Sequence, residues 1–109
     1  MKYLMLVCTD GEPFEADASE LNPQAWVDEM ERRDIRLTGD RLRPPSDATT
    51  VRVRDGETLV TDGPFVETKE YVGGFDIIDC ANLDEAIEVA SKHPIAKFGM
   101  IELRPFWAL

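Results

Sequence analysis

The chain has 109 residues, which is enough for one hydrophobic core and too few for two, so we expect a single domain spanning residues 1–109. Hydrophobic residues make up 43% of the chain and charged residues 31%, a balance that excludes a disordered protein. The formal net charge of -10 would repel phosphate backbones and anionic bilayers, so neither nucleic acid nor a membrane is an expected partner.

Residues 2–8 are the first predicted strand, and both of its faces are apolar. Because side chains alternate along a strand, one face carries Tyr3, Met5 and Val7 and the other carries Leu4, Leu6 and Cys8. A strand of this kind has to be covered on both sides. The apolar run is short and lacks a small-residue cleavage site, so it is not a signal peptide. Cys8 and Cys80 lack metal or redox spacing, which favours buried thiols in a reducing cytoplasm.

A loop over residues 11–21 and a short helix are expected next. Asn22 is a good helix cap, and Pro23 occupies a position where its missing N–H costs nothing. The helix should end near Arg33 and bury a stripe formed by Trp26, Val27 and Met30.

Three strand segments are predicted after this helix. Residues 35–42 alternate, with Ile35, Leu37 and Gly39 on the core face and Arg36, Thr38 and Asp40 on the outer face. Residues 49–54 and 57–61 are β-branched runs joined by Asp55-Gly56, a pair that favours a type I′ hairpin. In residues 71–80, Gly73-Gly74 indicates a bulge or a close backbone approach.

A second helix and a last strand complete the chain. Asn82 and Glu85 resemble a capping box, Pro94 prevents continuation, and the predicted buried stripe is Leu83, Ala86, Ile87 and Ala90. His93 lies at the end of this helix, where a cation would favourably meet the helix dipole; a general base is the alternative interpretation. The strand over residues 98–104 places Gly99, Ile101 and Leu103 on one side and Met100, Glu102 and Arg104 on the other.

This order predicts an α+β fold, β-α-β followed by an inserted hairpin and a second β-α-β. Two helices can cover one face of the resulting antiparallel sheet, and the first strand is apolar on both faces. We therefore expect a homodimer in which a second copy covers the other face. Phe106 and Trp107 would pack back on the sheet or contact this neighbouring subunit.

Several motifs in this chain resemble the DGPF family, a branch of the YCII-related domain proteins. The resemblance rests on "TDGPFVETKE" at 61–70 with "TTVRVRDG" before it, on "GGF" at 73–75, on "LDEA" at 83–86 and on "IELRP" at 101–105. It implies a ferredoxin-like sheet that pairs across a two-fold axis into a dimeric α/β barrel. Family roles are largely unassigned, although some members are encoded beside or fused to extracytoplasmic-function sigma factors.

The resemblance leaves three functions open for a cytoplasmic dimer. One is binding of a small polar molecule inside the barrel, another is proton-transfer catalysis of an isomerase or lyase type, and the third is regulation together with such a sigma factor. YCII relatives are thought to use a His and Asp pair, but this chain has no His in its first helix or second strand. This departure weakens the transfer of a catalytic role.

The candidate site combines a rigid loop with a polar sheet face. Asp62 can start a turn, Gly63 before a proline should be extended, and Pro64 then presents Phe65 and Lys69 at a loop edge, although Phe65 could instead plug the core. In a dimer barrel, the interior would carry Asp40, Glu102 and Arg104. These charges could bind a polar ligand or simply pair with one another. The sequence offers neither metal-ligand spacing nor a phosphate-binding glycine loop, so no metal or cofactor is expected.

Overall fold

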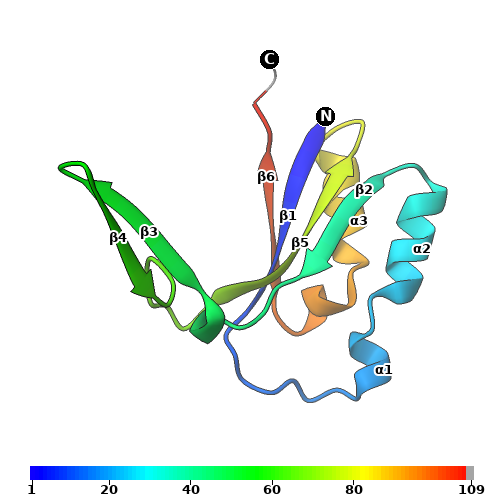
Figure 1. The fold of residues 1–109 in the computed structure, drawn as a ribbon. Coiled ribbons are helices and arrows are strands. Elements are labelled where there is room, and N and C mark those ends of the chain that lie inside the picture. Colours follow the sequence, from blue (N-terminus) through cyan, green and yellow to red (C-terminus); the bar gives the residue numbers. More distant parts are fainter. Residues whose placement is uncertain (108–109) are drawn as a thin grey trace.

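The computed structural model describes residues 1–107 and consists of a four-stranded antiparallel sheet, helices packed on it and a separate hairpin (Figure 1). The elements are β1 (Lys2–Thr9), α1 (Ala18–Leu21), α2 (Gln24–Arg32), β2 (Arg36–Arg41), the 3-10 turn η1 (Pro45–Asp47), β3 (Thr49–Arg54), β4 (Glu57–Asp62), β5 (Tyr71–Asp79), α3 (Leu83–Ser91), the 3-10 turn η2 (Pro94–Lys97) and β6 (Met100–Pro105). The sheet order is β2-β5-β1-β6, and β3 pairs with β4 alone. This arrangement confirms the ferredoxin-like α+β fold with an inserted hairpin.

The core lies between the sheet and the helices α2 and α3, which cover the same face (Figure 1). Its fully buried side chains come from β1, α2, β5 and α3: Tyr3, Met5, Met30, Ile78 and Val89. Trp26 joins the two helices, since its indole N–H donates to the carbonyl oxygen of Val89 at 2.9 Å. The helices therefore cover one face of β1, where Tyr3 and Met5 are buried.

The helix boundaries depart from the sequence expectation at two points. Pro23, and not Asn22, is the cap position of α2, although the Asn22 side chain accepts the Gln24 N–H at 2.9 Å. Residues 18–21 form the short helix α1 instead of loop, because the Asp17 carboxylate accepts the backbone N–H groups of Ser19 and Glu20. Asn82 caps α3 as predicted, accepting the Glu85 N–H at 2.9 Å.

The buried stripe of α3 is not the predicted one. It consists of Ala86, Val89 and Ala90, whereas Leu83 and Ile87 are about half exposed. Val89 lies at the contact between the two helices, where its carbonyl oxygen accepts the Trp26 indole N–H at 2.9 Å.

The predicted alternation along β2 is wrong at Arg36 and Leu37, because the strand contains a bulge there, whereas Thr38 and Asp40 lie on the outer face as predicted. Arg36 lies opposite Ile78 and Thr38 lies opposite Ile77, so Leu37 is an extra residue between them. Because cross-strand partners share a face, Arg36 lies on the helix-covered face with buried Ile78, and Leu37 is half exposed.

The bulge allows Arg36 to neutralise a buried carboxylate. Its Nε donates to Asp76 Oδ1 at 2.8 Å, and its Nη1 lies 2.9 Å from Glu31 Oε1. Burial raises the pKa of Asp76, and the hydrogen bond and charge of Arg36 oppose that rise. Gly39 stands opposite Asp76, and a Cβ there would lie 2.2 Å from Oδ1 and 2.6 Å from the Phe75 carbonyl oxygen. The ion pair therefore requires glycine at position 39.

The other strand predictions are confirmed, except that β6 begins at Met100 and not at residue 98, because Phe98 ends the turn η2. Val7 pairs with Gly74 and Cys8 with Val72, which places the predicted bulge at Gly73. Asp55 and Gly56 both have positive φ, 51° and 78°, as a type I′ turn requires. In β6, Ile101 and Leu103 pack against the core, and Met100, Glu102 and Arg104 are on the other side.

The chain end leaves the sheet after β6. The Phe106 N–H still donates to the Lys2 carbonyl oxygen at 3.1 Å, but the Trp107 side chain is 93% exposed. The expectation that Trp107 packs back on its own sheet is therefore wrong. Its contact with a neighbouring subunit stays a prediction.

His93 is not the helix-terminal cation that the sequence predicted. Its Nδ1 accepts the Ile95 N–H at 3.1 Å and so caps η2, and its ring meets Trp26 edge-on with 4.9 Å between ring centroids. The residue is 5% exposed, and this burial lowers its pKa to about 4. His93 is therefore a neutral part of the core at physiological pH.

The Gly39→Ala variant should lose on the order of 3 kcal/mol or more of unfolding free energy, because the new methyl group displaces Asp76 and leaves a buried charge without its partner. Gly73→Ala is the matched control in the same sheet, since its Cβ would meet its nearest neighbour at 3.8 Å. The control should change stability by less than about 1 kcal/mol. Urea denaturation of both variants checks this, and equal losses would contradict the account of Gly39.

Acid should destabilise the protein through His93. Its pKa is about 4 when folded and 6.5 in a free side chain, so the unfolded state binds the additional proton between these values and stability falls as the pH falls through that window. The contribution lost is about 3 kcal/mol. His93→Asn keeps an acceptor for the Ile95 N–H but does not titrate. Urea denaturation at pH 7 and pH 4.5 should show a smaller decrease for this variant, and parallel decreases would refute the assignment.

Candidate functional site

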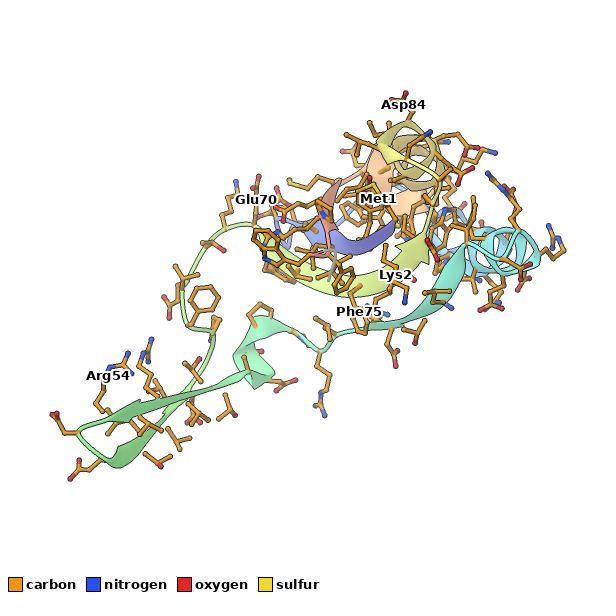
Figure 2. The ribbon with its side chains drawn as sticks, turned by 90° about the horizontal axis from the view of Figure 1, so that it is seen from above. Met1, Lys2, Arg54, Glu70, Phe75 and Asp84 are labelled. Atoms are coloured by element: carbon orange, nitrogen blue, oxygen red, sulfur yellow. The ribbon has the colours of Figure 1, made fainter. Side chains whose placement is uncertain are left out.

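The face of the sheet opposite α2 and α3 is apolar at its centre. Strand register places Leu4 and Leu6 of β1 beside Ile77 and Phe75 of β5 on this face, and all four side chains are partly exposed. Figure 2 shows Lys2 and Phe75 on the side of the sheet away from Asp84 of α3. We call this surface the open face; it consists of Lys2, Leu4, Leu6, Cys8, Thr38, Asp40, Val72, Phe75, Ile77, Asp79, Met100, Glu102 and Arg104.

Charged residues flank the apolar centre at both edges of the open face. Asp40 lies on β2 at one edge, and Glu102 and Arg104 lie on β6 at the other. The Arg104 guanidinium forms an exposed ion pair with the Glu102 carboxylate. The three predicted wall residues therefore share a face, but Asp40 does not meet the Glu102 and Arg104 pair within one chain.

A cleft of about 740 Å³ lies at the end of the sheet where the hairpin leaves it, between residues 42–48 and 64–72. This volume falls in the range of small-molecule sites. Its apolar lining includes Pro44, Pro45, Pro64, Phe65 and Val72, and its polar lining includes Asp47, Thr68, Glu70 and Tyr71. Because Val72 belongs to both surfaces, the cleft is continuous with the open face.

Gly63 fixes the loop that forms one wall of the cleft. Its N–H donates to the Ala48 carbonyl oxygen at 2.7 Å, and its own carbonyl oxygen accepts the Thr50 hydroxyl at 2.8 Å. Its φ is 100°, so the expected extended conformation is wrong; glycine, which lacks Cβ, can reach positive φ even before proline. The Gly63–Pro64 bond is trans. These two hydrogen bonds tie the loop to the opposite wall.

Two aromatic side chains have different roles around the cleft. Phe65 is 79% exposed, so the core-plug interpretation is wrong, and its ring contributes an apolar wall. The Tyr71 ring is held against Gly11, where an added Cβ would lie 3.2 Å from the ring carbon Cε1. Tyr71 also lines a smaller adjoining cleft of about 390 Å³ with Gly63 and Pro64. The cleft thus has one fixed ring and one exposed ring.

Cys8 connects the cleft to the β6 edge of the open face. It pairs with Val72 on one side and Met100 on the other. Burial raises the pKa of the Cys8 thiol, and the negative charges of Glu102 and Glu70 raise it further. A raised pKa keeps the thiol protonated at neutral pH, so Cys8 is not an activated nucleophile.

The predicted site residues therefore divide into three groups. Gly63, Pro64 and Phe65 lie at the two clefts, while Asp62 ends β4 opposite Thr49 and Lys69 is exposed in the loop. Asp40, Glu102 and Arg104 lie at the sheet edges, as described above. Sequence reasoning missed the second wall, although Pro44-Pro45 followed by Ser46-Asp47 was a signal for a rigid turn.

The buried titratable residues Asp76 and His93 lie on the helix-covered side and not at the cleft. Within residues 1–107, no group of three or more His, Cys, Asp or Glu side chains is arranged to hold a metal ion. No helix of this described part is long and apolar enough to cross a membrane. The cleft offers carboxylates, a phenol and hydroxyl groups on an apolar surface, which suit recognition of a small molecule.

Comparisons with known proteins agree with this architecture. A family model for the YCII-related domain matches residues 1–109. An uncharacterized protein of Rhizobium meliloti (strain 1021) is 51% identical over 67 residues, which cover 60% of this chain and 54% of that protein. The match thus spans about half the length of this curated relative.

Proposed function

Because the chain belongs to the YCII-related domain family, we propose that it acts as a homodimer that binds a small polar molecule between its subunits. The ligand would have an apolar body and at least one charged or hydrogen-bonding group. Two free cysteines, one of them buried, support a reducing cytoplasmic location.

The continuity of the cleft with the open face supports this proposal most strongly. Small-molecule sites are concave and mostly apolar, with a few polar groups that fix orientation. The cleft supplies Tyr71, Thr68 and Glu70 as such groups, and the open face supplies an apolar floor through Leu6 and Phe75. A second open face placed opposite would turn this exposed surface into an enclosed cavity.

Two-fold symmetry would also bring the predicted charges together. β2 and β6 are at opposite edges of the same sheet, so two sheets that face each other across a two-fold axis parallel to the strands place β2 of one copy beside β6 of the other. Eight strands then close a barrel of the size that holds one small ligand. In that arrangement Asp40 of one copy approaches Glu102 and Arg104 of the second copy. The site would be incomplete in a single chain.

Proton-transfer catalysis remains a second candidate on one observation. Glu70 lines the cleft and Glu102 lies on the open face beside Leu6, so two carboxylates border the proposed cavity. A pair of carboxylates with different surroundings can act as acid and base. The buried groups Asp76 and His93 lie behind the sheet and would take no part. Binding is the better supported function, because it requires no perturbed acid or base in the cleft.

Arg104→Ala should weaken ligand binding about tenfold or more while the dimer persists, because the cavity loses a charge-assisted hydrogen bond. The test is a panel of small carboxylates, phosphates and amines followed by amide NMR shifts of the labelled protein. Binding compounds should shift residues 64–72, and titration then gives the affinity.

Arg32→Ala is the matched control, since Arg32 is an exposed arginine on α2, on the far side of the sheet. It should bind like the wild type. Equal affinities of the Arg104 and Arg32 variants would exclude Arg104 from the site, and a panel without shifts at residues 64–72 would contradict the binding function.

A further inference from the structure

The hairpin β3–β4 is an amphipathic arm that extends from the rest of the chain (Figure 1). We call residues 49–62 the arm. Its register pairs Val51 with Val60 and Val53 with Thr58, which places these four side chains on one face. Arg52, Leu59, Arg54 and Glu57 share the other face.

The apolar face of the arm is exposed in a single chain. Val51, Val53 and Val60 are 60%, 58% and 64% exposed, respectively. A two-stranded hairpin without a covering partner is at best marginally stable in water. Burial of these three valines against a partner would therefore favour association.

The single chain exposes as much excess surface as an interface would need. Its accessible surface is 7879 Å², whereas a compact protein of 12.3 kDa exposes about 6,100 Å². Its radius of gyration is 16.0 Å, compared with about 13 Å for a compact chain of this length. The excess of about 1,800 Å² exceeds the roughly 800 Å² that each partner buries in a standard interface and suits an obligate homodimer.

The direction of the arm indicates where the covering partner lies. In both views the arm extends on the side of the sheet away from α2 and α3 (Figures 1 and 2), and Figure 2 shows Arg54 near its far end. A molecule seated on the open face therefore lies beside the arm. Phe65, in the loop that returns from the arm to β5, stands at the same boundary.

We propose that the arm clasps a second copy of this chain, with Val51, Val53 and Val60 packed on that copy. The inference rests on the proposed homodimer and adds the element that holds it together. By two-fold symmetry each chain gives one arm and receives one. The partner would then also cover exposed Phe65 and supply the missing side of the cleft.

Val60→Asp and Leu59→Asp are a matched pair of tests, because the two residues are adjacent in β4 and point to opposite faces of the arm. Sedimentation equilibrium should give the wild type twice the chain mass of 12.3 kDa at 50 µM. Val60→Asp places a charge in both copies of the arm contact and should raise the dissociation constant of the dimer at least about a hundredfold. Leu59→Asp should change it less than about threefold. Far-UV circular dichroism of both variants verifies that the sheet and helices outside the arm remain folded.

A monomeric wild type at 50 µM would overturn the clasp, as would Val60→Asp and Leu59→Asp variants that weaken the dimer equally or not at all. A monomer that binds a different protein through Val60 would overturn it too. The amide NMR titration separates this inference from the binding function. If the wild-type dimer shows ligand shifts and the Val60→Asp variant remains a dimer, only the clasp is rejected. If Val60→Asp dissociates the dimer but the wild type shows no ligand shifts, only the binding function is rejected.

Discussion

The central constraint in this fold is that β1 is apolar on both faces while the chain supplies helices to one. Tyr3 and Met5 are buried beneath α2 and α3, and Leu4 and Leu6 on the alternate positions remain partly exposed. Each strand residue points to one face or the other, so no rotation of β1 could bury both sets. We propose that a second copy of the same chain covers the remaining set with its own equivalent surface.

This constraint relates the site to the assembly. The cleft beside Tyr71 opens onto the same surface, and the charged residues Asp40 and Arg104 stand at its two edges. These features belong to one cavity only if the open face is enclosed. The arm, whose valines are also exposed, bounds the same space. An uncovered sheet, a divided set of charges and a projecting hairpin thus have one common explanation.

The sequence predicted the elements well because their signals are local. Asn82 before α3 and Asp55-Gly56 in the hairpin act within four residues, and both predictions are confirmed. Features that depend on partners far away in the chain were not predicted from the sequence. Leu37 bulges because Arg36 reaches Asp76 on another strand, and His93 is neutral because Trp26 packs on it. The second wall of the cleft, at Pro44-Pro45, was missed for the same reason: its closeness to Phe65 is set by the fold and not by spacing in the chain.

The most direct test of the central claim is the reactivity of Cys8, which lies on the open face. In a Cys80→Ala variant, Cys8 is the only remaining thiol, and its rate of modification by a maleimide can be followed over a range of protein concentrations. If a second copy covers the open face, the rate constant should fall severalfold between nanomolar and tens of micromolar protein. A rate constant that does not depend on protein concentration would show that the open face stays in contact with water and would contradict the account.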